Sequence, residues 1–308
     1  MSILQIEGLS VCFDTIKGAV RAAQDVSLDL EEEETLAMVG ETGCGKSVVA
    51  NAILQLLPGN ARVQGRIVYR GRDLLQLCEK DLSQIRGREI SIVFQNPSLA
   101  LNPVYRIAEQ AAEPLLISKA SRESARKVAR NLLARLGLAG FEDMYPFQLS
   151  GGMNQRAMIT CSAVLNPKVI IADEPTKGLD QELVRDVLEE IRKVKEANGS
   201  SLLLITHDLG VAKSISNRVA IMYCGDVVEL GETEKVLQNP LHPYARALLD
   251  SLPERGFKPI PGPSPSMINP PEGCKFHPRC PFRLKICSSQ RPELSLHEDG
   301  AVRCWLWV

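Results

Sequence analysis

The chain has 308 residues, roughly two domains' worth of sequence and enough to bury a sizeable core. Hydrophobic residues make up 44% and charged residues 24%, a balance that excludes wholesale disorder. The net charge of −1 gives no reason to expect nucleic-acid binding. No apolar run reaches the roughly 18 residues of a transmembrane helix, and the first residues lack a signal-peptide pattern, so we expect a cytoplasmic protein.

Short apolar runs of the kind found in buried parallel strands recur along residues 1–252. They are Thr35 to Val39, Val169 to Ala172 and Ser201 to Thr206, and helical patterns lie between them. Between about residues 102 and 164 the pattern is helical throughout. We therefore expect an α/β domain over residues 1–252, with a parallel sheet, antiparallel N-terminal strands and an inserted all-helical subdomain.

One helix of this insertion is expected to begin after Ser121, which is a suitable N-cap residue. Its apolar side chains Val128, Leu132, Leu133 and Leu136 recur at helical spacing. They predict the buried face of an amphipathic helix.

The strongest chemical signal is GETGCGKS, residues 40–47, between an apolar run and a helical pattern. Its glycines allow backbone amides at a helix start to face an anion. Lys46 would contact the β- and γ-phosphates, and the Ser47 hydroxyl would ligate Mg²⁺. An ordinary glycine-rich turn does not explain the Lys-Ser pair, so the segment predicts a P-loop. The residues expected to bind ATP here are Gly40, Glu41, Thr42, Gly43, Cys44, Gly45, Lys46, Ser47 and Val48.

Two further segments fit a nucleotide site. Asp173 and Glu174 follow the apolar run VIIA, where Asp173 would hold the Mg²⁺ shell and Glu174 would face the attacking water. The segment LSGG, residues 149–152, opens another helix, with Ser150 as a suitable N-cap and exposed amides as a second anion site. Alone, it could be only a helix cap.

The order of these motifs along the chain is specific. The motif set of the ATP-binding cassette family is present in full: the P-loop, Gln95, LSGG, the Asp-Glu pair, GLD at residues 178–180 and His207. The chain therefore resembles the nucleotide-binding subunit of an ABC transporter, from about residue 3 to residue 308.

The resemblance implies a role for each matching residue. The catalytic set would be Lys46, Gln95, Glu174 and His207, with Gln95 also near Mg²⁺. The signature and D-loop residues, expected to face the ATP of a partner, are Leu149, Ser150, Gly151, Gly152, Met153 and Asp180.

Some positions depart from the family pattern or stay open. Asn154 stands where Gln or Arg commonly follows the signature, and Lys177 and Gly178 replace the commoner Thr-Ala. Phe13 is our candidate for stacking on adenine, although it could simply pack within a strand, and counting back from the P-loop reaches Lys17 instead.

Residues 253–308 predict a different kind of structure. Ten of the 19 prolines lie between Pro253 and Pro292, so we expect an irregular extension, apart from the core that carries the P-loop. The segment Asn239 to Pro253 and the following GCKFHPRCPFRLKIC resemble the C-terminal extension of ATPases that serve oligopeptide, dipeptide and nickel importers.

Four cysteines crowd into this extension: Cys274, Cys280, Cys287 and Cys304. Four thiolates suit zinc or an iron-sulfur cluster, and free or disulfide-forming thiols are a third alternative. The resemblance favours a 4Fe-4S cluster, with Zn²⁺ as the alternative. His277 could replace one ligand, although a surface role is the simpler interpretation.

Together these features predict a peripheral ATPase subunit at the cytoplasmic face of the inner membrane, powering import of peptides or a nickel complex. The resemblance implies a related, non-identical second ATPase, two transmembrane permease subunits and, indirectly, an extracytoplasmic substrate-binding protein. A groove beside Gln95 and the helical insertion would receive the permeases. The alternatives are a soluble ABC ATPase of repair or translation and an iron-sulfur redox or sensor protein.

Overall fold

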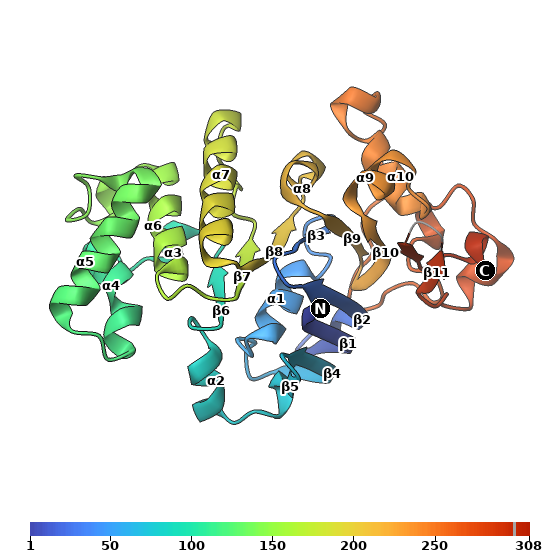
Figure 1. Cartoon of the computed structure of the whole chain (residues 1–308). Helices are drawn as coiled ribbons and strands as arrows, with labels where there is room; N and C mark the ends of the chain where they lie inside the picture. Colours follow the sequence, from blue (N-terminus) through green and yellow to red (C-terminus); the bar gives the residue numbers. More distant parts are fainter. Residues whose placement is uncertain (298–299) are drawn as a thin grey trace. The chain divides into compact units, whose positions relative to one another are not determined.

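The computed structural model describes residues 1–297 and 300–308 and forms two compact units (Figure 1). The first contains residues 1–31, 35–77 and 204–308, and the second contains residues 32–34 and 78–203. Both combine helices with β-strands, which confirms the α/β class. The motifs expected to serve one nucleotide are therefore divided between two units of the chain.

The first unit contains an antiparallel sheet with strand order β2-β1-β4-β5. The long strands β1 and β2 pair with each other, and this pairing begins at Ser2 and Glu31 and ends at Thr15 and Gly18. Strand β1 also pairs with β4. This confirms the antiparallel N-terminal strands. The strands are β1 (Ser2–Thr15), β2 (Gly18–Glu31), β4 (Ala61–Tyr69) and β5 (Arg72–Asp73).

Five further strands of this unit lie side by side in the order β11-β12-β10-β9-β3. Strand β3 is buried along its whole length, as its unbroken apolar sequence requires, and it runs parallel to β9. The strands are β3 (Thr35–Val39), β9 (Arg218–Tyr223), β10 (Asp226–Glu232), β11 (Ser295–His297) and β12 (Gly300–Val302). The helices are α1 (Lys46–Ile53), α8 (Leu209–Ile215), α9 (Thr233–Gln238) and α10 (Pro243–Asp250).

The second unit is built on β6 (Ile90–Val93), which runs parallel to β7 (Val169–Asp173). Strand β8 (Ser201–Thr206) leads the chain back into the first unit. The helices are α2 (Glu79–Ile85), α3 (Pro97–Ala100), α4 (Ile107–Ile117), α5 (Arg122–Leu133), α6 (Gly151–Ala163) and α7 (Gln181–Asn198). Helices α4, α5 and α6 pack on one another, and residues 102–164 contain no strand (Figure 1).

Short turns of helix complete the structure. A π-helical turn at Ala134–Leu138 follows α5, and 3₁₀ turns occupy Leu74–Gln76, Pro146–Gln148, Pro253–Arg255, His277–Arg279, Lys285–Ser288 and Trp305–Trp307. Within the described residues, every helix is too short or too polar to cross a membrane.

Helix α5 begins as expected but buries a different face. Ser121 accepts a hydrogen bond from the backbone N–H of Ser124, at 3.2 Å. The buried side chains of the helix are Ala125, Ala129 and Leu133, whereas Val128 is 41% exposed. The predicted face is wrong at Val128 because small alanines, and not only large apolar residues, let two helices approach closely.

The C-terminal extension is mostly irregular, but it does not fold apart from the core. Strand β12 pairs with β10, joining Glu229 to Val302 and Gly231 to Gly300. Phe276 is fully buried, with its ring centroid 5.3 Å from that of Tyr223. These contacts join residues far apart in sequence, which local composition does not report, and the division of the chain at residue 253 stays a prediction.

Candidate nucleotide-binding site

The P-loop connects the end of β3 to the start of α1 in the first unit. Gly45 caps α1 with a left-handed φ of 108°, and a Cβ there would lie 2.0 Å from the Ala22 carbonyl oxygen, so the position accepts only glycine. The Lys46 Nζ donates hydrogen bonds to the carbonyls of Gly40 (2.8 Å) and Glu41 (3.1 Å). The Lys46 ammonium is therefore held by carbonyls of the P-loop itself. Thr42 of the same loop is exposed to solvent.

Cys44 is the one P-loop residue whose side chain is buried beside Lys46. Burial raises the pKa of its thiol, and the nearby Lys46 ammonium opposes this rise only in part. Its carbonyl accepts a hydrogen bond from the Gly225 backbone N–H at 2.8 Å. Cys44 therefore anchors the loop as a neutral thiol, and its backbone N–H donates to the Glu41 carbonyl at 3.2 Å.

His207 also belongs to the first unit and immediately follows β8. Its side chain is exposed. The next residue, Asp208, caps α8 by accepting hydrogen bonds from the N–H groups of Gly210 (2.7 Å) and Val211 (3.2 Å). This cap, which the sequence analysis did not identify, fixes the backbone next to His207.

Phe13 lies on β1, where it pairs with Val20 of β2 and Ala61 of β4, and its side chain is only partly buried. Lys17 is exposed in the turn between β1 and β2. Stacking of Phe13 on adenine stays a prediction.

In the second unit, Gln95 and the Asp173-Glu174 pair leave the same edge of a sheet. Strands β6 and β7 are parallel and pair Val93 with Ala172, so both chains emerge at their carboxyl ends. Asp173 and Glu174 are 6% and 7% exposed. Glu174 has a left-handed φ of 49°, a conformation that costs a non-glycine residue about 1–3 kcal/mol and is found at functional sites.

The signature segment forms an open helix N-terminus on α6. Ser150 accepts a hydrogen bond from the Met153 N–H at 3.3 Å, while Ser150 and Gly151 are exposed. A Cβ at Gly152 would lie 3.1 Å from the Leu183 side chain of α7, so a small residue is needed there. The N-terminal amides of α6 are thus accessible to an anion.

Two neighbouring residues have structural roles that the sequence did not reveal. Asn154, one of the departures from the family pattern, donates from Nδ2 to the Pro146 carbonyl at 3.0 Å and so ties α6 to the preceding turn. Asp180 caps α7 by accepting a hydrogen bond from the Leu183 N–H at 3.0 Å. The predicted role of Asp180 toward a partner's nucleotide stays a prediction.

The structure thus brings the P-loop and His207 into the first unit, and Gln95, Asp173, Glu174, the signature and Asp180 into the second. Within each unit these residues lie where strands end or helices begin. That both sets act on one nucleotide stays an expectation from the resemblance.

The four cysteines of the extension gather in the first unit. The Cys274 N–H donates to the Cys287 carbonyl at 2.9 Å. Burial raises the pKa of Cys274 to about 12, and the three other thiols of the set add to this rise. Among residues 1–297 and 300–308, however, no three His, Cys, Asp or Glu side chains are arranged to hold a metal ion. The structure therefore shows four neighbouring cysteines, and a metal centre stays a prediction.

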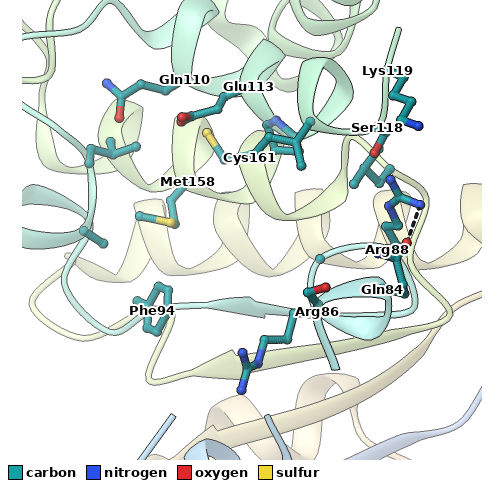
Figure 2. Close-up of a pocket in the computed structure, with 17 residues that line it drawn as sticks. Gln84, Arg86, Arg88, Phe94, Gln110, Glu113, Ser118, Lys119, Met158 and Cys161 are labelled. Atoms are coloured by element: carbon teal, nitrogen blue, oxygen red, sulfur yellow. Dashed lines mark hydrogen bonds between the residues drawn. The ribbon is translucent and has the colours of Figure 1, made fainter. Parts of the chain in front are cut away.

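A groove with a volume of about 830 Å³ lies beside Gln95 in the second unit (Figure 2). Phe94, which precedes Gln95, and Met158 of α6 give it apolar lining. Arg86 and Arg88 border it, and Glu113 of α4 faces Cys161 across its upper part in the figure. Burial raises the pKa of Cys161 to about 12, and the Glu113 carboxylate contributes to the rise.

The P-loop, the buried acidic pair after β7 and the helix N-terminus at LSGG define a P-loop ATPase of the ATP-binding cassette type. Residues 23–177 match the family model described as "ABC transporter". The chain belongs to the ABC transporter family and is an ATPase of that family. Residues 228–287 also match the family described as "Oligopeptide/dipeptide transporter, C-terminal region".

Named relatives cover almost the whole chain. The dipeptide transport ATP-binding protein DppD of Bacillus subtilis is 40% identical over 99% of this chain and 94% of its own length. The oligopeptide transport ATP-binding protein OppD of Bacillus subtilis is 38% identical, over 99% of this chain and 88% of its own. A solved ATP-binding cassette, a dimer in a post-hydrolysis state with ADP and phosphate, matches with a TM-score of 0.68 and 27% identity, covering 75% of this chain and 98% of that one.

Proposed function

We propose that this chain is the ATP-hydrolysing subunit of a peptide importer and works at the cytoplasmic face of a membrane. The observation that carries the proposal is full-length similarity to dipeptide and oligopeptide transport ATP-binding proteins, including the C-terminal extension. These names favour peptides over a nickel complex. The family match and the similarity also argue against a redox or sensor protein and a repair or translation ATPase.

The residues fit MgATP and its hydrolysis. The P-loop amides, Lys46 and Ser47 would hold the phosphates and Mg²⁺, with Asp173 and Gln95 completing the metal shell. The metal ion neutralises charge on the phosphates when it is bound. Glu174 would polarise the attacking water, and His207 would hydrogen-bond the γ-phosphate. The strained backbone at Glu174 supports a precise placement of its carboxylate.

The exposed N-terminus of the signature helix supports a head-to-tail dimer, in which the P-loop of one cassette meets the LSGG segment of another. The solved cassette described above is dimeric. A related second ATPase and two permease subunits are the proposed partners. Each ATP would be enclosed only when both cassettes close, and hydrolysis would reopen them.

Turnover should therefore depend on partners. We expect the purified chain alone to hydrolyse ATP slowly, because a γ-phosphate at Lys46 is enclosed only by a signature helix from another chain. Adding the second ATPase and the permeases should raise kcat per chain. A high kcat that does not change on dilution, in a species shown to be monomeric by light scattering, would contradict the dimer mechanism.

The groove beside Gln95 is the proposed docking site of the permeases. Its apolar lining and bordering arginines suit a short amphipathic helix that carries acidic residues. Ile117, which lines the groove and is 72% exposed, is not part of the nucleotide site.

We expect Ile117→Asp to remove most of the permease-dependent rise in turnover and leave the basal rate unchanged. Val128→Asp on α5, outside the groove lining, is the matched control and should keep the stimulation. The measurement is the ATPase rate at increasing permease concentration. Equal stimulation of both variants would move the docking site elsewhere.

We further propose that Cys274, Cys280, Cys287 and Cys304 hold a structural 4Fe-4S cluster, with Zn²⁺ as the alternative. The neighbouring thiols, of which those of Cys287 and Cys304 are buried, provide the soft donors that both metals prefer. A metal would stabilise a proline-rich segment that has little regular structure of its own.

Chain purified without oxygen should be brown and contain about four irons and four sulfides. Each Cys→Ser change should lower the metal content and increase proteolysis after Pro253. Cys78→Ser, an exposed cysteine outside the set, is the control. Colourless anaerobic protein with one zinc would exclude the cluster, and metal-free protein with an unchanged proteolysis pattern would exclude both metals.

A further inference from the structure

The C-terminal extension contacts the P-loop directly. Arg279 lies 238 residues after Glu41, yet its Nη1 is 3.2 Å from both carboxylate oxygens of Glu41. The Ser264 hydroxyl donates a further hydrogen bond to this carboxylate. The Arg279 side chain is only 8% exposed and that of Glu41 is 23% exposed. The pair is therefore largely removed from solvent. Water and salt screen the attraction between such buried charges only weakly.

Arg279 is itself held in place. Its Nε donates to the Pro261 carbonyl at 2.8 Å, and its Nη1 donates to the Tyr223 hydroxyl at 3.2 Å. The guanidinium carbon lies 5.8 Å from the centroid of the Tyr223 ring. Because the guanidinium is fixed by these contacts, little side-chain entropy remains to be lost when it contacts Glu41.

Glu41 transmits this contact to the phosphate-binding end of the loop. Its backbone N–H donates to the hydroxyl of buried Tyr244 at 3.1 Å, and its carbonyl accepts the Lys46 Nζ at 3.1 Å. The side chain, the N–H and the carbonyl of this one residue are thus each bound by different residues. A change at Arg279 alters the environment of the residue that holds Lys46.

The charges of Glu41 and Arg279 also indicate a role in nucleotide binding. An unpaired Glu41 carboxylate in the P-loop would repel the phosphates of a nucleotide, and Arg279 compensates that charge. We propose that Arg279 is a positioning residue for nucleotide binding, through which the C-terminal extension neutralises Glu41 and holds the P-loop. The proposal concerns the ATP site, so it does not depend on the transported substrate or on a metal at the four cysteines.

A double-mutant cycle tests this role. Arg279→Gln should weaken MgATP binding about tenfold, measured as Kd by titration calorimetry with a nonhydrolysing ATP analogue. Adding Glu41→Gln should restore Kd to within about twofold of the unchanged chain, because the uncompensated carboxylate is then gone. Arg283→Gln, an exposed arginine of the same segment, is the matched control and should not change Kd.

Two results would overturn the proposal. One is a Kd for Arg279→Gln equal to that of the control. The other is a double variant that binds more weakly than Arg279→Gln, because a merely structural role gives additive losses. If Arg279→Gln does not fold, Arg279→Lys replaces it in the cycle. It keeps the charge but loses the planar guanidinium, so a loss of about threefold is expected, and a loss of about tenfold or more would contradict the role of the charge.

Discussion

Replacing Glu174 with glutamine is expected to preserve MgATP binding and to remove nearly all turnover. An amide cannot polarise the attacking water as a carboxylate does, whereas the P-loop is unchanged. The variant should also accumulate as an ATP-bound dimer, because the closed cassettes no longer hydrolyse the nucleotide that joins them. The measurements are kcat, Kd for MgATP and the size of the ATP-bound species.

Glu182→Gln is the matched control, since Glu182 is exposed in the first turn of α7 and is not assigned to the site. It should keep the unchanged chain's rate. If Glu174→Gln retained more than about a tenth of kcat, the barrier would have changed by less than about 1.4 kcal/mol. The essential carboxylate would then be another residue.

Replacing Lys275 with alanine is expected to lower the free energy of unfolding by about 3–5 kcal/mol. The Lys275 ammonium is 2.9 Å from a carboxylate oxygen of Asp226, and both side chains are 4% exposed. Nζ also donates to the Cys224 carbonyl at 2.7 Å. Removing Lys275 leaves the buried Cys224 carbonyl without this donor. Among the ion pairs observed in residues 1–297 and 300–308, the Asp226 carboxylate then keeps only the one with Arg291.

Chemical denaturation measures this loss, and hydrogen exchange shows whether opening is greatest after Pro253. Lys285→Ala is the control, because Lys285 is exposed on the same segment, and it should change stability by less than about 0.5 kcal/mol. A loss below about 1 kcal/mol for Lys275→Ala would mean that the extension is not anchored by this pair.

The features that the sequence predicts well are those written in a few consecutive residues. The P-loop is predicted from an apolar strand, three glycines and Lys46-Ser47, which are all close together in sequence. Ser150 and Ser121 act as N-caps as expected, because a cap needs only the residue and the backbone that follows it.

The features that the sequence does not reveal depend on distant residues. Neither Glu41 nor Arg279 has a local pattern that identifies the other, and the same holds for Lys275 and Asp226. The three-residue strand β12 is too short to show a period, and β10 supplies the pairing that defines it. The extension therefore looked independent in sequence, although long-range contacts join it to the P-loop.

The most direct test of the central proposal is ATP-dependent peptide uptake into vesicles that contain this chain, its partner ATPase and the permeases, supplied with the substrate-binding protein. The account predicts that a labelled dipeptide accumulates with MgATP and that Glu174→Gln in this chain stops most of the accumulation. Uptake that is unaffected by Glu174→Gln, or ATP hydrolysis in the complete assembly with no peptide uptake, would contradict it.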